Sequence, residues 1–340
     1  MSDTAATPAR TEAGTASGPL LSIRGLRTYF DTEAGVAKAV DGVDLDIRPG
    51  EVLGLVGESG SGKSVTALSV LRLIPSPPGR IVGGEIRFRG RDLLALSWEE
   101  LRTVRGRDIS MIFQEPMTSL NPVFTIGMQV TEVILQHEKV SQEEANRRAV
   151  EILTEVGIPD AARRMTQYPH QLSGGMRQRV MIAMALVLNP DLLIADEPTT
   201  ALDVTIQAQI LDLMLQLKAR RPGAAILMIT HNLAVVAETC DRVAVMYGGK
   251  IQEVAPVSRL FENPLHPYTQ GLLGSIPRVD GLRARRLNVI PGTVPSILDM
   301  PAGCKFVTRC PHRFEPCDGQ EPSLLEMEPD HFVRCHLHQR

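Results

Sequence analysis

The stretch Gly57-Glu-Ser-Gly-Ser-Gly-Lys63-Ser64 decides the fold of this chain, and it follows directly on the apolar run Val52-Leu-Gly-Leu-Val56. The run predicts a buried strand and Val65 to Leu73 predicts a helix, so the glycine-rich turn joins a strand to a helix. Glycines let the backbone turn tightly and bring several N–H groups close to a polyphosphate. The new helix adds its positive N-terminal end. We therefore predict a phosphate loop that binds a nucleotide.

Two side chains of this loop have predicted tasks. We expect Lys63 to reach the terminal phosphates and the Ser64 hydroxyl to ligate Mg²⁺. The residues expected to contact the nucleotide in this region are Gly57, Ser59, Gly60, Ser61, Gly62, Lys63, Ser64 and Val65.

Composition places the chain among ordinary globular proteins. It has 340 residues, of which 43% are hydrophobic and 22% charged, with a formal net charge of −3. The near-neutral balance gives no electrostatic footprint for nucleic acid, so no nucleic-acid partner is expected. The longest apolar run, Val180 to Leu188, is about half of the ~20 residues that a membrane span needs. With no signal peptide after Met1, we expect a soluble chain whose membrane role is peripheral.

Sequence texture divides the chain into three parts. Residues 1–18 are small and polar and predict a disordered tail. Residues 19–255 alternate strand and helix patterns, which predicts an α/β domain with a mixed but largely parallel sheet and a helical insert at about 115–180. Residues 256–340 are rich in proline and predict a loop-rich extension.

Polar residues follow the predicted strands at one edge of the sheet. Asp196 ends the strand beginning at Leu192, where a carboxylate can reach Mg²⁺, and Glu197 is placed to orient or deprotonate an attacking water. His231 and Gln114 follow two other predicted strands and would lie near a γ-phosphate or Mg²⁺. The competing interpretation gives these residues only structural work, as helix caps or solvated loop side chains.

A second glycine-containing turn precedes a predicted helix from about Gly175 to Leu188. Ser173, Gly174 and Gly175 would offer a hydroxyl and free N–H groups to a phosphate. By itself, such a turn also fits a plain helix N-cap.

In this order and spacing, the motifs resemble the ATP-binding cassette (ABC) ATPase family over about residues 20–255. The motifs that carry the resemblance are GESGSGKS (57–64), FQEP (113–116), LSGGMRQR (172–179), LLIADEPTTALD (192–203) and THN (230–232). The resemblance implies a P-loop NTPase of ABC type that hydrolyses ATP with Mg²⁺.

The same resemblance assigns roles to single residues. Phe30, or its neighbour Tyr29, would stack on adenine. Asp196 would join Ser64 and Gln114 at Mg²⁺, with Gln114 also acting as the lid glutamine that senses the transporter. Glu197 would be the catalytic base and His231 the γ-phosphate switch.

Two further implications concern a partner chain. Asp203 would belong to the loop that links two ATPase subunits. Ser173 to Gly175 would act in trans, on ATP held by the partner subunit. A second ABC ATPase subunit, either a paralogue or a copy of this chain, is therefore expected.

The extension resembles that of the dipeptide/oligopeptide branch of ABC importers. Its marker is Asn263-Pro-Leu-His-Pro-Tyr-Thr269, and Glu115 to Val123 is also similar to this branch. The resemblance implies two transmembrane permease subunits, a substrate-binding protein that acts through them, and a peripheral position on the cytoplasmic face of the inner membrane. Import of nickel or another solute, and a soluble ABC ATPase acting on ribosomes or nucleic acid, are the alternatives.

Four cysteines lie in the extension. Cys304, Cys310, Cys317 and Cys335 are separated by five, six and seventeen residues, whereas Cys240 lies in the main domain. A segment with few large apolar residues buries little core, so a bound metal could stabilise it. The cysteine spacing alone allows zinc, in a Cys₃His site with a nearby histidine, or a [4Fe–4S] cluster. Resemblance to importers with this cysteine pattern implies the [4Fe–4S] cluster.

Overall fold

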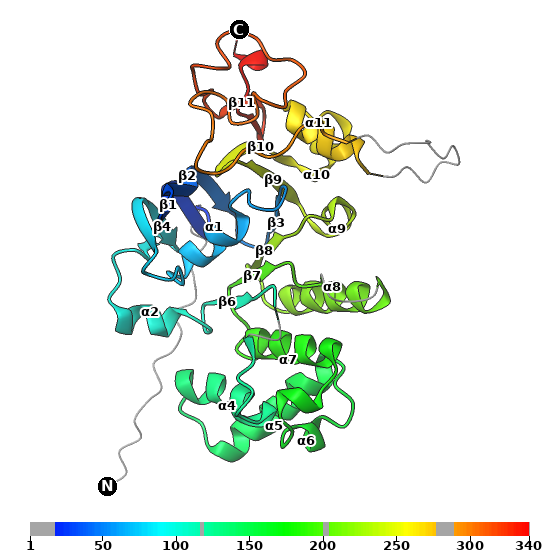
Figure 1. Cartoon of the computed structure of the whole chain (residues 1–340). Coiled ribbons are helices and arrows are strands. Elements are labelled where there is room, and N and C mark those ends of the chain that lie inside the picture. The colour runs from blue at the N-terminus through cyan, green and yellow to red at the C-terminus, as the bar shows by residue number, and fades with distance from the viewer. Residues whose placement is uncertain (1–17, 116–118, 200–203, 277–288, 340) are drawn as a thin grey trace, which may run out of the picture.

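The computed structural model describes residues 18–115, 119–199, 204–276 and 289–339. The predicted tail falls almost entirely outside these ranges. Figure 1 shows a helical lobe at the bottom, two sheets in the middle and the C-terminal extension at the top. The strands are β1 Leu21–Thr32, β2 Gly35–Ile47, β3 Val52–Val56, β4 Gly79–Phe88, β5 Arg91–Asp92, β6 Ile109–Ile112, β7 Leu192–Asp196, β8 Ala225–Ile229, β9 Arg242–Tyr247, β10 Lys250–Pro256, β11 Leu325–Glu328 and β12 His331–Val333.

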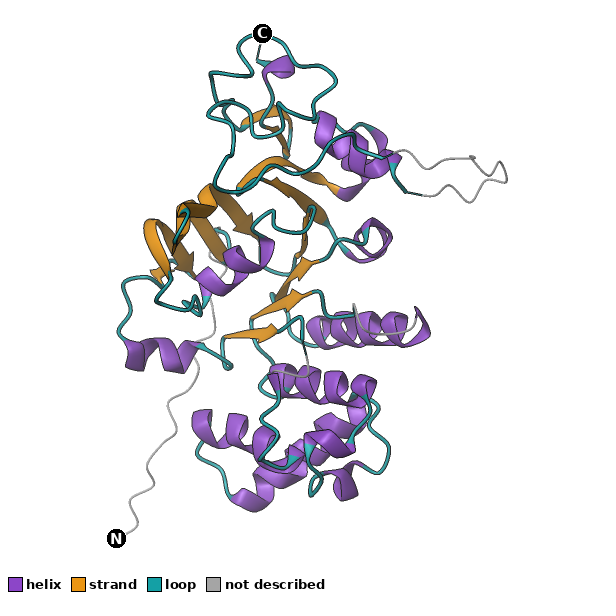
Figure 2. Cartoon of the chain, in the orientation of Figure 1, coloured by secondary structure: helices purple, strands orange, loops and turns teal. Residues whose placement is uncertain are grey.

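Helices surround the sheets, and Figure 2 shows them most densely in the lower lobe. They are α1 Lys63–Val70, α2 Trp98–Val104, α4 Ile126–His137, α5 Gln142–Glu155, α6 Ala161–Arg164, α7 Gly174–Leu186, α8 Val204–Ala219, α9 Leu233–Thr239, α10 Val257–Glu262 and α11 Pro267–Gly274, with 3₁₀ turns at Pro169–Gln171 and His336–His338.

The larger sheet confirms the predicted mixed sheet. Its order is β11-β12-β10-β9-β3-β8-β7-β6. Strands β6, β7, β8, β3 and β9 are parallel, and β10, β12 and β11 are antiparallel. Because parallel strands end at the same edge, the residues that follow β3, β6, β7 and β8 are brought together there.

A second, antiparallel sheet of four strands, β2-β1-β4-β5, covers α1. Apolar side chains of β1, β2 and α1 share one buried cluster with those of β3, β7 and β8. Inside this cluster the Thr28 and Ser69 hydroxyls are 2.8 Å apart. The phosphate-loop helix is thus held between both sheets.

Helix α1 differs from its prediction at both ends. It begins at Lys63, two residues early, because Gly62 at its N-cap adopts a left-handed conformation with φ of 107°. It ends at Val70, because Arg72 already has a φ of 51°. The glycine turn therefore places the lysine of the motif in the first helical turn.

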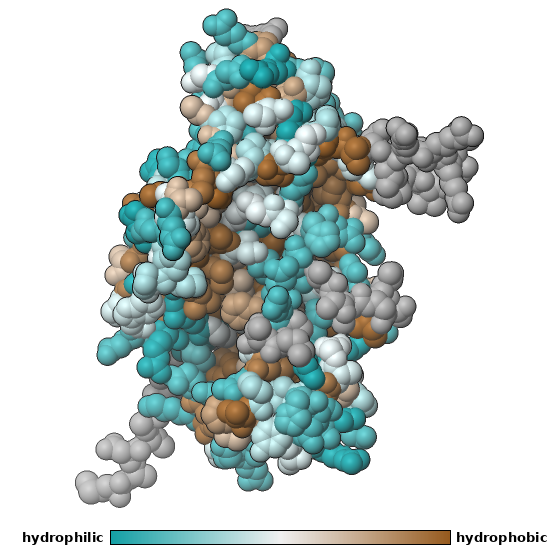
Figure 3. Space-filling model, viewed as in Figure 1, coloured by the Kyte–Doolittle hydropathy of each residue, from teal (hydrophilic) through white to brown (hydrophobic). Residues whose placement is uncertain are grey.

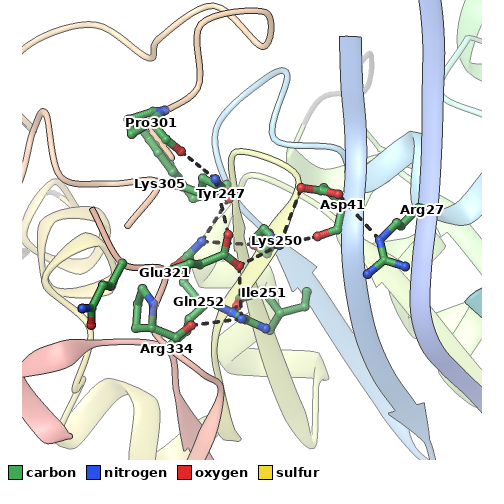
Figure 4. Close-up of polar contacts among 12 residues, drawn as sticks. Arg27, Asp41, Tyr247, Lys250, Ile251, Gln252, Pro301, Lys305, Glu321 and Arg334 are labelled. Carbon is green, nitrogen blue, oxygen red and sulfur yellow. Dashed lines mark hydrogen bonds and ion pairs between the residues drawn. The ribbon is translucent and has the colours of Figure 1, made fainter. Parts of the chain in front are cut away.

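The extension is joined to the main sheet rather than set apart from it. Strand β12 pairs with β10, and β11 pairs with β12. Glu321 adds an ionic junction, with its carboxylate 2.7 Å from Lys250 Nζ, 3.4 Å from Lys305 Nζ and 3.5 Å from the Arg334 guanidinium (Figure 4). The division of the chain into parts 1–18, 19–255 and 256–340 stays a prediction.

Candidate functional site

The phosphate loop has a backbone that only glycine accommodates at two positions. Gly57 has a φ of 153°, and a Cβ there would lie 2.1 Å from the Met246 carbonyl oxygen. Gly62 has a φ of 107°, and a Cβ would lie 2.4 Å from the Ala39 carbonyl oxygen. Because both neighbours are backbone atoms that cannot rotate away, the loop keeps its shape only with glycine at these positions.

Lys63 is buried beneath this loop. Its Nζ donates to the carbonyl oxygens of Gly57 at 2.8 Å and Glu58 at 3.0 Å. Burial lowers the pKa of Lys63, while the negative charges of Glu197, Asp196 and Glu58 oppose that shift. The ammonium is therefore held at the meeting point of the loop and the acidic strand end.

Asp196 and Ser64 are neighbours, as the predicted Mg²⁺ site requires. Asp196 is the last residue of β7, and the Ser64 hydroxyl donates to its carboxylate. Burial raises the pKa of Asp196, and the Ser64 hydrogen bond partly offsets the rise. Oδ1 of Asp196 is buried without a hydrogen-bond partner. A hydroxyl and an orphaned carboxylate oxygen side by side fit the oxygen ligands that Mg²⁺ prefers.

Glu197 lies between two other predicted residues. Gln114 Nε2 donates to its Oε2 at 3.4 Å, and His231 Nδ1 lies 3.2 Å from its Oε1. Glu197 has a φ of 46°, which is uncommon for a residue with a side chain, and its N–H donates to the Ile229 carbonyl oxygen at 2.9 Å. Because β6, β7 and β8 are adjacent, the residues that follow them converge at one point.

The two candidate aromatic residues have different surroundings. The Tyr29 hydroxyl donates to Asp41 Oδ1 at 2.6 Å, and Lys38 Nζ lies 5.8 Å from the centre of the Tyr29 ring. Burial raises the pKa of Tyr29 to about 12, helped by the bond to Asp41. Phe30 pairs across the sheet with Ala37. Tyr29 is thus engaged in a polar contact, which leaves Phe30 the better candidate for stacking.

The second glycine turn is exposed on the helical lobe. Ser173 is the N-cap of α7, and its hydroxyl accepts from the Met176 N–H at 3.4 Å. Ser173 and Gly174 are exposed and Gly175 is half-buried. Figure 1 shows α7 on the opposite side of β6 and β7 from α1, so the two glycine turns are not assembled into one pocket within this chain. Asp203 lies outside the described residues.

The four extension cysteines lie in one region, all as free thiols. Burial raises the pKa of Cys304 to about 12 and that of Cys335 to about 11, and neighbouring thiols of the set add to both shifts. Backbone N–H groups two residues further along the chain donate to the sulfurs of Cys304, Cys310 and Cys335. Such donors favour thiolates, so the donor set fits a thiolate-bound group chemically.

The geometry of the described residues assembles neither of the two predicted metal sites, the zinc site or the [4Fe–4S] site. In the described parts of the chain, no three His, Cys, Asp or Glu side chains are grouped so as to hold a metal ion. His331 bonds to Glu253 at 2.8 Å, and ring nitrogens of His336 and His338 lie within 3.1 Å of backbone carbonyl oxygens. The histidines predicted as possible ligands of a Cys₃His site are His312, His331, His336 and His338, and the last three of these have other partners.

Two residues next to the phosphate loop are not predicted by any motif of the sequence. Arg309 forms an ion pair with Glu58 at 2.6 Å, and the Tyr268 hydroxyl accepts from the Glu58 N–H at 2.8 Å. Tyr268 belongs to the extension's marker and Arg309 precedes Cys310, but neither position indicates a contact with the loop.

Comparisons with known proteins agree with this geometry. The ABC transporter family model matches residues 40–200, and the model for the oligopeptide/dipeptide transporter C-terminal region matches residues 252–317. The oligopeptide transport ATP-binding protein AppD of Bacillus subtilis is 53% identical over 94% of this chain and 97% of its own. The dipeptide transport ATP-binding protein DppD of the same organism is 50% identical over 94% of each chain.

Among solved structures, the chain is similar to the ATP-binding cassette MJ0796, described as dimeric in a post-hydrolysis state with ADP and phosphate bound. That match has a TM-score of 0.63 and 28% identity, covering 70% of this chain and 98% of the other. In the described residues, no helix is long and apolar enough to cross a membrane.

Proposed function

The chain belongs to the ABC transporter family, in the branch with the oligopeptide/dipeptide C-terminal region, and on this premise we propose that it hydrolyses ATP to drive peptide import through a membrane permease. The observation that carries the proposal is the convergence of Gln114, Glu197 and His231 at one sheet edge, with Lys63 and Asp196 beside them. The relatives' names favour import over a ribosomal or nucleic-acid role.

Each residue has a distinct task in the proposed reaction. The loop N–H groups and Lys63 bind the β- and γ-phosphates. The Glu197 carboxylate accepts a proton from the water that attacks the γ-phosphorus. Its contacts with Gln114 and His231 hold the carboxylate in one orientation, and His231 reaches the γ-phosphate. Phe30 stacks on adenine.

Ser64 and Asp196 would hold Mg²⁺, with Gln114 as a further ligand from the lid. The ion supplies charge neutralisation at the phosphate oxygens. The orphaned Oδ1 of Asp196 supports this assignment.

A complete site requires two ATPase subunits. Ser173 and its glycines act on nucleotide bound to the phosphate loop of the partner, which is a second copy or a paralogue. Support comes from their exposure, from the position of α7 across β6 and β7 from α1 in Figure 1, and from the dimeric cassette to which the chain is similar.

Permease subunits are proposed to contact the helical lobe, which follows Gln114 in the chain. Several large apolar side chains here are exposed, and Figure 3 shows brown atoms on the surface of this lobe. They are Val123 at 70%, Met128 at 55%, Phe124 at 42% and Leu135 at 37% exposure. Exposed apolar patches of this kind mark interaction sites. The chain would thus lie at the cytoplasmic face of the inner membrane.

A [4Fe–4S] cluster is proposed for Cys304, Cys310, Cys317 and Cys335. The three buried thiols of Cys304, Cys317 and Cys335 and the half-buried thiol of Cys310 support it. Burial and the neighbouring thiols raise the pKa of Cys304 and Cys335, and backbone N–H donors partly offset the rise. A brown protein with absorbance near 400 nm is expected. A colourless preparation loaded with zinc would overturn the assignment.

The ATPase proposal is tested with two variants of the full chain. Lys63→Ala should abolish nucleotide binding, because it removes the buried ammonium beneath the loop. Glu197→Gln should bind ATP but hydrolyse it at least about 100-fold more slowly, as expected for loss of a general base. Normal hydrolysis by Glu197→Gln would show that the base is another residue.

A further inference from the structure

Two residues of the C-terminal extension hold Glu58, the second residue of the phosphate loop. Arg309 binds the Glu58 carboxylate with both terminal nitrogens, Nη1 to Oε2 at 2.6 Å and Nη2 to Oε1 at 3.1 Å. The Tyr268 hydroxyl accepts from the Glu58 backbone N–H at 2.8 Å. Side chain and backbone of one loop residue are thus both fixed from outside the cassette. We call Arg309 and Tyr268 the Glu58 clamp.

The clamp is built into a packed aromatic cluster. The Arg309 side chain is only 4% exposed, and its guanidinium lies 5.9 Å from the ring centres of Tyr247 and Phe306. Its Nε also donates to the Pro291 carbonyl oxygen at 3.1 Å. Tyr268 is fully buried, with its ring 4.7 Å from that of Tyr247. Packing on several sides restricts both clamp side chains, unlike a mobile surface ion pair.

Glu58 is directly connected to the phosphate-binding lysine. Its carbonyl oxygen accepts from Lys63 Nζ at 3.0 Å and from the Ser61 N–H at 3.2 Å. Its carboxylate is a negative charge within the loop that receives a polyphosphate. Without Arg309, this unpaired charge would repel the phosphates, because charges closer than about 10 Å, the Debye length at 0.1 M salt, are only partly screened.

We propose that Arg309 and Tyr268 are positioning residues for nucleotide binding, which fix the phosphate loop through Glu58 and neutralise its carboxylate. The extension then serves the ATP site itself, in addition to any metal that it carries. This inference rests on the proposed ATPase function, and its test separates the two.

The test is a double-mutant cycle in the full chain, with binding of AMP-PNP and Mg²⁺ measured by calorimetry. Arg309→Gln should weaken binding about tenfold, equivalent to about 1.4 kcal/mol. The double variant Glu58→Gln/Arg309→Gln should recover to within about threefold of the parent, because the unpaired charge is gone. Tyr268→Phe, which removes only the hydroxyl, should weaken binding about threefold.

Arg313→Gln is the matched control. Arg313 lies four residues further along the same loop and pairs with Asp318 at 2.8 Å, but both side chains are more than half exposed. Its loss should leave the affinity for AMP-PNP within about twofold of the parent. If Arg309→Gln does not fold, Arg309→Lys is used instead. Lysine keeps the positive charge but cannot make the bidentate hydrogen bond to the Glu58 carboxylate, so binding should weaken about threefold.

Two results would overturn the proposal. In the first, Arg309→Gln binds AMP-PNP as tightly as Arg313→Gln does. The same holds for Arg309→Lys where that variant replaces Arg309→Gln. The other is a double variant as weak as Arg309→Gln, since a purely structural role would not be rescued at Glu58. Lys63→Ala distinguishes failure of the ATPase proposal, because normal binding by that variant would refute nucleotide binding at this loop.

Discussion

Replacing Glu321 by glutamine would test whether the extension is held to the cassette by charge. The Glu321 carboxylate contacts Lys250, Lys305 and Arg334 within 3.5 Å, and these three cationic side chains are only 10–11% exposed (Figure 4). The glutamine keeps the shape but removes the negative charge. Among the described residues, Asp41 is then the carboxylate left within ion-pair distance of these cations, 3.7 Å from Lys250 Nζ.

The loss in free energy of unfolding expected for Glu321→Gln lies between the values for exposed and for buried ion pairs. Exposed ion pairs contribute about 0–1 kcal/mol, whereas removing one partner of a buried pair costs about 3–5 kcal/mol. Glu321 is 28% exposed, and its partners keep backbone contacts such as the bond from Lys305 to the Pro301 carbonyl oxygen at 2.6 Å. We therefore expect a loss of about 2 kcal/mol in the free energy of unfolding.

The measurement is urea unfolding at pH 7, followed by circular dichroism. Asp318→Asn provides the control, because it neutralises a carboxylate of the same extension whose one ion pair is exposed. That variant should lose less than about 0.5 kcal/mol. Equal stability of Glu321→Gln and Asp318→Asn would refute the argument that the buried cations need Glu321.

Two other predictions concern the partner subunit and acid stability. Ser173→Ala should leave ATP binding by the single chain within about twofold, yet slow phosphate release by the assembled transporter at least about tenfold, because its hydroxyl acts on the partner's nucleotide; weakened binding in the isolated chain would contradict an action in trans. Burial lowers the pKa of His266 to about 4, with Glu253 opposing and His338 reinforcing the shift. The unfolded chain therefore takes up this proton near pH 6.5 and the folded chain only near pH 4. As the pH is lowered through that window, the free energy of unfolding should fall by up to about 1.4 kcal/mol per pH unit. His266→Asn should flatten this fall in urea midpoints measured between pH 7 and 4.5, and an unchanged slope would assign the acid sensitivity to other groups.

Local sequence was sufficient to predict the elements of the ATP site. Glycine spacing specifies the phosphate loop, because Gly57 and Gly62 occupy backbone conformations that side chains rarely adopt. The expected meeting of Gln114, Glu197 and His231 follows from topology, since each residue comes after a parallel strand and those strands are neighbours. The length of α1 was predicted less well, because its end depends on one backbone dihedral angle at Arg72.

Only the tertiary structure decided how the extension meets the cassette. Pairing of β12 with β10, the ionic junction at Glu321 and the clamp on Glu58 all join residues far apart in the sequence. Periodicity and turn signals describe how a segment folds on itself, and they carry no record of which distant segment packs against it. Burial and charge pairing select those partners once the chain is folded. The proline-rich extension therefore gave no indication in its sequence that Arg309 lies against the phosphate loop.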